Sequence, residues 1–152
     1  MSQKEFKFTE RDARYLWILY SAYESSVPVL GPSEVSEQLS VSKVTAYQEL
    51  RKLVAMGYAI HVPSKGFMIS EKGTQIVRQL IRNHRILETF FVHVLNMPLD
   101  EACSNARSLE FAARAEFIDR LCAFLGHPSY CPHGYEIPHS ENCYKRRGKD
   151  DE

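Results

Sequence analysis

The chain lacks the run of about 20 apolar residues that a membrane-spanning helix requires. His93 and Asn96 interrupt its most apolar stretch, residues 90–97, and the first residues hold no apolar core of a secretory signal. Net charge is also lacking, because 19 Lys and Arg balance 19 Asp and Glu. The first two absences predict a cytoplasmic protein without membrane partners. The neutral balance argues weakly against nucleic-acid binding, although the placement of charges matters more than their sum.

Signatures of catalysis are missing as well. The chain has no glycine-rich loop that would cradle a phosphate and no nucleophile elbow. Its His, Cys and Glu residues could be arranged into a catalytic site, but nothing in their spacing asks for one. We therefore predict that the chain is not an enzyme.

The stretch over residues 31–70 is typical of a winged helix-turn-helix. Pro32 begins a short helix, residues 40–42 form a turn, and a second helix runs to about Met56 before Gly57 ends it. Residues 58–62 and 67–69 are the expected strands of a hairpin. A helix from an N-cap at Thr9 to about Ser26 precedes this unit. The residues expected to pack it are Ala13, Leu16, Trp17, Tyr20 and Tyr23.

The second helix of this unit and the hairpin carry the side chains that we predict to bind double-stranded DNA. Gln48 suits adenine and Thr45 suits a thymine methyl in the major groove, while Lys65 at the hairpin tip suits a phosphate. The full DNA-binding set is Ser42, Lys43, Thr45, Gln48, Lys52 and Lys65. The buried set expected for this helix is Val44, Tyr47, Leu50, Leu53 and Val54. Solvated surface residues, or a protein-interaction module that borrows the fold, are the alternatives.

The second half of the chain is expected to be helical. A long helix begins at Ser70 and reaches about His93, with Gly73 predicting a frayed first turn. Its expected buried stripe is Ile76, Leu80, Leu87, Phe91 and Val94. Helices over about 99–111 and 114–125 carry more apolar surface than a small winged domain needs, which favours a homodimer. We predict a mainly α fold with a DNA-binding domain at 1–72, a helical dimerisation and metal-sensing domain at 73–126, and a Cys/His tail at 127–152 whose last residues, 145–152, are disordered.

Four stretches carry a resemblance to a known family. Residues 35–57, FMISEKG at 67–73, RNHRILE at 82–88 and HPSYCPHGYEIP at 127–138 resemble the metal-dependent regulators related to the diphtheria toxin repressor and the manganese transport regulator. The resemblance implies a winged-helix DNA-binding domain, a helical dimerisation domain, and repression of metal-homeostasis genes. Some members carry a third, SH3-like domain, which we do not expect in a chain of this length. It also implies an ancillary metal pair at His84 and Glu88, whose i, i+4 spacing places both on one helix face.

The main regulatory site of that family does not carry over. Its ligand positions align with Arg14, Arg107, Glu110 and Phe111, of which only Glu110 can bind a hard cation. We predict that this site no longer binds metal, and that Arg14 or Arg107 pairs with Glu110.

Cysteine is absent before Cys103, and the four cysteines of the chain are Cys103, Cys122, Cys131 and Cys143. In a reducing compartment they indicate ligands or buried thiols before disulfides. We predict that they form one four-thiolate site, for an iron–sulfur cluster or Zn²⁺, through which a homodimeric repressor responds to iron or iron–sulfur status. The alternatives are Zn²⁺, Fe²⁺ or Mn²⁺ as the bound ion, thiol redox switches, incidental thiols, and a mixed site. That mixed site would use some of His84, Glu88, His127, His133 and His139.

Overall fold

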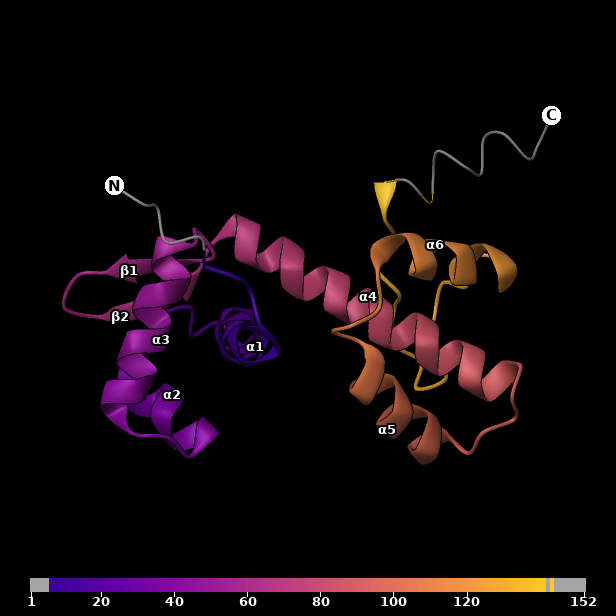
Figure 1. Ribbon diagram of the computed structural model, residues 1–152, viewed down its shortest axis with the longest axis horizontal. Helices are drawn as coiled ribbons and strands as arrows, with labels where there is room; N and C mark the ends of the chain where they lie inside the picture. Colours follow the sequence, from indigo (N-terminus) through magenta and orange to yellow (C-terminus); the bar gives the residue numbers. More distant parts are fainter. Residues whose placement is uncertain (1–5, 142, 144–152) are drawn as a thin grey trace. The chain divides into compact units, whose positions relative to one another are not determined.

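The computed structural model describes residues 6–141 and 143, so the predicted disorder of residues 145–152 lies outside the described residues. The chain divides into two units, residues 1–77 and 78–152. The first contains α1 (Glu10–Glu24), α2 (Pro32–Leu39), α3 (Lys43–Ala55), β1 (Ala59–Val62) and β2 (Gly66–Ile69). α4 (Glu71–His93) runs through the boundary into the second unit, where α5 (Leu99–Leu109) and α6 (Ala115–Phe124) follow. Figure 1 shows these elements, and they confirm the predicted mainly α fold with a two-stranded wing.

Local side-chain caps begin the helices of the first unit. Thr9 and Asp12 form a capping box at α1, in which each side chain accepts from the other residue's backbone N–H. Ser42 caps α3, because its Oγ accepts from the N–H of Thr45 at 3.1 Å. Ser40 makes the turn between α2 and α3 in the left-handed region, at φ 55°. The turn-and-cap chemistry therefore begins these helices where the sequence predicts.

The hairpin of the first unit pairs β1 and β2 in antiparallel register, with Ala59 opposite Ile69 and Val62 opposite Gly66. Figure 1 shows its loop projecting beside α3, as a wing does. Gly66 has φ +137°, and a Cβ there would lie 2.2 Å from the carbonyl oxygen of Leu30. Only glycine therefore allows the segment before α2 to bridge onto β2.

The core residues predicted from the apolar periodicity of α1 and α3 are partly wrong. Trp17 and Tyr23 are 42% and 51% exposed, and Val44 and Tyr47 on α3 are 66% and 45% exposed. The apolar residues buried on the two helices are Ala13, Tyr15, Leu16, Ile18, Leu19, Ala46, Leu50 and Leu53. Several apolar side chains of α1 and α3 thus face outward, where a partner molecule can bury them.

The first turn of α4 is anchored, contrary to the fraying expected from Gly73. Ser70 Oγ accepts from the N–H of Gly73 at 3.0 Å and donates to the carbonyl of Gly57 at 2.7 Å. A Cβ on Gly73 would lie 2.2 Å from the carbonyl oxygen of Tyr58. Glycine is needed here because the helix passes directly against the start of the hairpin.

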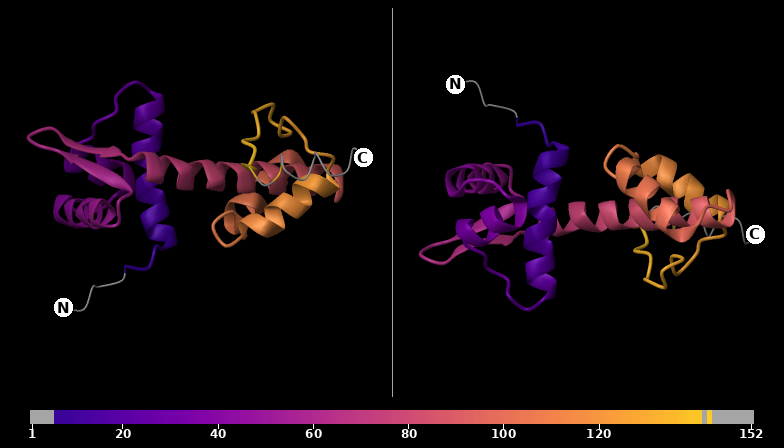
Figure 2. Two further views of the ribbon diagram at one scale, coloured as in Figure 1. Left: turned by 90° about the horizontal axis from the view of Figure 1, so that it is seen from above. Right: turned by 90° about the horizontal axis from the view of Figure 1, so that it is seen from below.

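The core of the second unit joins α4, α5, α6 and the segment after α6. Its buried members are Ile86, Leu87, Phe91, Ala102, Ala106, Ile118, Cys122, Cys131, Ile137 and Cys143. Figure 2 shows the segment after α6, in yellow, looping over the side of α4 that faces away from α5 and α6. Of the predicted α4 stripe, Leu87 and Phe91 are buried, whereas Val94 is 40% exposed. Polar Arg82, Asn83, Glu88 and Thr89 are buried on the same helix.

Among the described residues, no helix is both long enough and apolar enough to cross a membrane.

Candidate functional site

The predicted DNA-contact residues form an accessible surface in the first unit. Ser42, Lys43 and Gln48 are exposed on the first turns of α3, and Lys65 is exposed at the hairpin turn. Thr45 is half-buried, and its hydroxyl hydrogen-bonds with that of Ser42 at 2.9 Å. The arrangement leaves one short polar edge of the helix and one lysine open to a ligand.

Lys52, the remaining member of that set, lies in an ion pair instead. Its Nζ donates to both carboxylate oxygens of Asp12, at 3.0 and 3.1 Å, and the Asp12 side chain is fully buried. Burial by itself raises the pKa of Asp12. The N–H and hydroxyl of Thr9 and the Lys52 ammonium outweigh burial and lower it. Lys52 therefore ties α3 to α1, and its charge is already matched within the unit.

In the second unit, three side chains converge on one point with the chemistry of a metal site. Nε2 of His84 lies 3.2 Å from Oε2 of Glu88 and 3.6 Å from Sγ of Cys103. These three ligand atoms all lie within 4.8 Å of one another. Glu88 is almost fully buried, while His84 and Cys103 are half-buried. The predicted ancillary pair is thus joined by a thiol from α5.

Glu110 holds the other nitrogen of the same imidazole. Its Oε2 lies 2.7 Å from Nδ1 of His84, and because a carboxylate only accepts, Nδ1 donates. Such a carboxylate on the far nitrogen fixes the tautomer and orientation of a metal-binding histidine. His84 therefore presents Nε2 to Glu88 and Cys103. The pairing of Glu110 with His84 was missed from the sequence, which assigned Glu110 to an arginine.

Among the described residues Arg107 forms no ion pair with Glu110, contrary to one of the two predicted pairings. Arg107 is exposed, and its guanidinium is 3.9 Å from Sγ of Cys103, one turn earlier on α5. Arg14 belongs to the first unit, so its pairing with Glu110 stays a prediction. Burial and the charge of Glu88 raise the pKa of the Cys103 thiol, and Arg107 partly offsets this. An ion is therefore needed to convert this thiol into a thiolate ligand near neutral pH.

Glu88 also faces a second histidine, from the segment after α6. Nδ1 of His133 donates to Oε1 of Glu88 at 2.8 Å. Glu88, His133 and Cys131 form another group whose ligand atoms lie within 4.8 Å of one another. The same segment is held to α4 by Arg82, whose guanidinium donates to the Pro138 carbonyl at 2.9 Å. Residues 131–133 thus stand next to the His84 cluster and orient its buried carboxylate.

The four cysteines do not meet in one site. Cys103 lies with His84, Cys131 lies with His133, and Cys122 and Cys143 form a third cluster with His127. No cluster in the described range, 6–141 and 143, contains more than two cysteines. The structure therefore does not form the predicted four-thiolate site that an iron–sulfur cluster would use. The reason is topological. Cys103 on α5 and Cys131 after α6 reach α4 in two different clusters, whereas Cys143 returns to Cys122 on α6. The mixed alternative, which combines histidine, glutamate and cysteine, is the one that the geometry supports.

Two protein-family models match the chain, one over most of each unit. The chain matches the model described as "Iron dependent repressor, N-terminal DNA binding domain" over residues 7–67. It matches the model described as "Iron dependent repressor, metal binding and dimerisation domain" over residues 70–139. The second range contains the whole His84–Glu88–Cys103 cluster, together with Glu110 and His133, and ends before Cys143.

Individual relatives and solved structures agree with these matches. The iron-dependent repressor IdeR of Mycobacterium tuberculosis is 27% identical over 124 residues, which are 82% of this chain and 54% of IdeR. The chain therefore spans about half the length of that relative. The hypothetical protein SSo2273 from Sulfolobus solfataricus superimposes with a TM-score of 0.79 at 28% identity, covering 87% of this chain and 100% of that one. ScaR with bound Zn²⁺ superimposes with a TM-score of 0.73 at 30% identity, covering 84% of this chain and 59% of ScaR.

Proposed function

Because the chain belongs to the iron-dependent repressor family of metal-dependent transcriptional regulators, we propose that it is a homodimeric repressor whose DNA affinity is set by a divalent ion at His84, Glu88 and Cys103. The observation that carries this proposal is the convergence of three different donor atoms on one point, with Glu110 holding the far nitrogen of the histidine. The exposed polar edge of α3 and the lysine of the wing supply the DNA-binding surface.

The donor set narrows the class of ion. A thiolate with an imidazole and a carboxylate suits Zn²⁺ or Fe²⁺, whereas Mn²⁺ prefers oxygen ligands. Bonds of about 2.0–2.3 Å place the ligand atoms of a tetrahedral ion roughly 3.3–3.8 Å apart. The separations of 3.2 and 3.6 Å from His84 Nε2 come close to these values. We therefore propose Zn²⁺ or Fe²⁺ as the effector.

The link from the ion to DNA is α4. It carries two of the three ligands, and its first turn is hydrogen-bonded through Ser70 to Gly57, two residues after the end of α3. An ion that bridges α4 and α5 removes conformational freedom from a helix that begins beside the wing. This restriction would favour DNA binding only when the ion is present.

The dimer is proposed from apolar side chains that the second unit leaves in solvent. These are Val94, Leu95, Leu99, Leu109, Phe117 and Phe124, with Phe124 70% exposed. We propose that a second copy of the chain buries these side chains. A two-fold dimer would present two α3 helices to two half-sites of an operator.

DNA selection followed by fluorescence anisotropy tests this function. A duplex is first selected from a random pool in the presence of Zn²⁺ and, in parallel and without oxygen, Fe²⁺. Wild-type protein should bind the selected duplex at least about tenfold more tightly with the ion than with a chelator, a coupling of about 1.4 kcal/mol. Cys103→Ser should lose this difference but keep its fold by circular dichroism. Equal affinity with and without either ion would contradict the proposal.

The DNA surface has its own control in the same assay. Lys65→Ala should lower the slope of log affinity against log salt by about 1, because one phosphate contact is removed. Gln48→Ala should change which duplex is preferred, with little effect on the slope. Unchanged binding in both variants would place the DNA surface elsewhere.

A further inference from the structure

We propose that Cys122, His127 and Cys143 form a second metal site, a zinc site that fastens the segment after α6 onto that helix. Sγ of Cys122 lies 3.6 Å from Sγ of Cys143 and 3.6 Å from Nδ1 of His127. Nδ1 of His127 lies 3.0 Å from Sγ of Cys143. The site uses none of the ligands of the His84 cluster, so it stands whether or not the proposed function is correct.

The three ligand atoms lie close enough together for one ion to bind all of them. A zinc ion with bonds of about 2.3 Å to sulfur and 2.0–2.1 Å to nitrogen places tetrahedral ligands roughly 3.5–3.8 Å apart. The two sulfur–nitrogen distances and the sulfur–sulfur distance in this cluster are 3.0–3.6 Å, and each differs from that range by less than 0.6 Å. Two thiolates neutralise the charge of a divalent ion, the imidazole adds a neutral ligand, and zinc favours such sulfur and nitrogen donors.

His127 is placed by an uncommon backbone conformation. It adopts a left-handed φ of 56° directly after Gly126, which is also left-handed at φ 77°. Its N–H donates to the carbonyl of Cys122 at 2.8 Å, which turns the chain back over the end of α6. A non-glycine residue in this region is uncommon, and such conformations concentrate at functional sites. The turn therefore brings an imidazole to the thiol five residues earlier.

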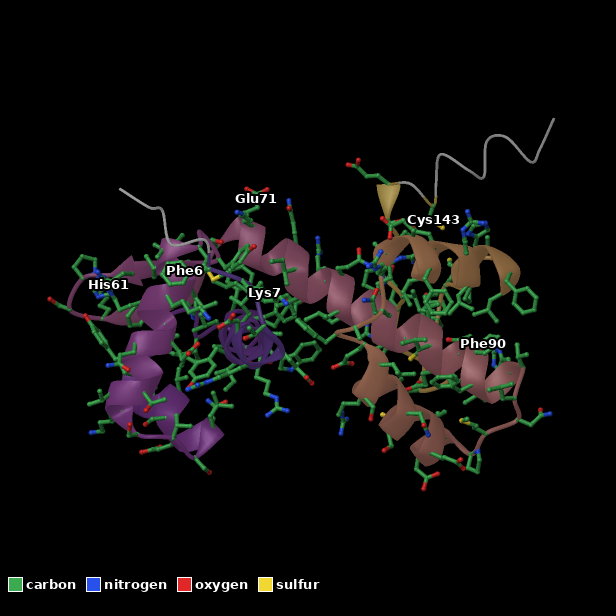
Figure 3. The ribbon with its side chains drawn as sticks, viewed as in Figure 1. Phe6, Lys7, His61, Glu71, Phe90 and Cys143 are labelled. Carbon is green, nitrogen blue, oxygen red and sulfur yellow. The ribbon has the colours of Figure 1, made fainter. Side chains whose placement is uncertain are left out.

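Cys143 is placed by a separate network on the other side. Its N–H donates to Oγ of Ser140 at 3.2 Å, and that hydroxyl donates to Oδ1 of Asp119 at 2.8 Å. Asp119 also accepts from the guanidinium of Arg82 at 2.8 Å, a pair in which both side chains are nearly buried. Figure 3 shows Cys143 beside α6, and its side chain is 2% exposed. Two independent supports thus deliver the two thiols and the imidazole to one buried point.

Metal content per chain tests the site directly. Protein purified with Zn²⁺ and dialysed without chelator should contain one equivalent of zinc more than His127→Asn, by elemental analysis and native mass spectrometry. Asparagine is chosen because it tolerates a left-handed backbone but offers no imidazole ligand. His93→Asn, which changes an exposed histidine at the end of α4 that belongs to none of the three clusters, is the matched control and should keep the full content.

Cobalt substitution identifies the ligands. Co²⁺-loaded wild type should show intense thiolate-to-cobalt charge-transfer absorption, and Cys143→Ser should lose most of it. Cys143→His restores a ligand and should regain one equivalent of metal with a weaker charge-transfer band. Cys103→Ser should lose the equivalent at His84 and its metal-dependent DNA affinity, yet keep the two-thiolate absorption, so failure of one site is distinguishable from failure of the other.

Two results would overturn the zinc site. One is an unchanged zinc content in His127→Asn and Cys143→Ser. The other is a Cys122–Cys143 disulfide in the reductant-treated, zinc-exposed protein, seen as a mass lower by two hydrogens and as thiols that do not react with iodoacetamide until stronger reduction. That result would make the pair a redox switch instead.

Discussion

Replacement of Glu110 tests the role of this residue in the proposed metal site at His84. The structure places Oε2 of this carboxylate 2.7 Å from Nδ1 of His84, while Oε2 of Glu88 lies 3.2 Å from the other ring nitrogen, Nε2. We predict that Glu110→Gln and Glu110→Ala weaken metal binding in steps. Glutamine keeps an acceptor but loses the charge, whereas alanine removes both.

The size of each step follows from the contact. Loss of an outer-shell partner of a ligating histidine typically lowers metal affinity by 10–100-fold, which is about 1.4–2.8 kcal/mol. A hydrogen bond to a charged group contributes about 1.5–3 kcal/mol by itself. The two estimates agree, so we expect about tenfold for Glu110→Gln and about 100-fold for Glu110→Ala.

Competition with a chromogenic chelator, with Zn²⁺ as the probe, measures these affinities. Glu101→Gln, an exposed carboxylate on α5, is the matched control and should bind as wild type does. Wild-type affinity in Glu110→Ala would refute the positioning role. Complete loss of the ion in Glu110→Gln would refute it in the other direction, because Glu110 would then be a ligand.

Three further perturbations probe other parts of the chain. Asp12→Asn should make thermal unfolding of the first unit less sensitive to pH between about pH 5 and 2. The lowered pKa of Asp12 means that its stabilisation is present above the unfolded pKa and is lost as pH falls through the folded one. Glu49, whose pKa is raised mainly by burial, acts with the opposite sign and should be replaced in parallel. Gly73→Ala should destabilise the first unit by about 1–3 kcal/mol in thermal melts despite the helix preference of alanine, because the new Cβ would meet the Tyr58 carbonyl; a stabilised variant would contradict this. Phe124→Ser should weaken the dimer at least about tenfold in light scattering after gel filtration; an unchanged dimer would place the interface elsewhere.

Element boundaries were readable from the sequence because their signals are local. Thr9 and Ser42 cap their helices within three residues, and Gly57 ends α3 in the left-handed region. These signals do not depend on distant contacts, so the predicted and observed ends differ by one or two residues. The i, i+4 spacing of His84 and Glu88 was also local, and the structure confirms that they face one another.

The faces of the helices and the partners of the cysteines were harder to predict, because they depend on the whole fold. Periodicity shows that a helix has an apolar face, but Trp17 and Val44 are apolar and exposed, as residues at an interface are. Gly73 was expected to fray the start of α4. The contact that requires glycine there is with Tyr58, fifteen positions earlier in the chain, and local spacing does not show it. The position of Cys143 depends on the turn at His127 and the Arg82–Asp119 pair, neither of which is marked by short-range spacing. The sequence therefore suggested one site for all four cysteines, whereas the structure distributes them over three clusters.

Anomalous diffraction at the zinc edge, from a crystal grown with Zn²⁺, is the most direct test of the metal site at His84. We predict a peak bonded to His84 Nε2, Glu88 Oε2 and Cys103 Sγ, at about 2.0–2.3 Å from each, with Glu110 still on Nδ1. Zinc bound directly by Glu110 with Nε2 of His84 left free, or no peak at this cluster, would contradict the account.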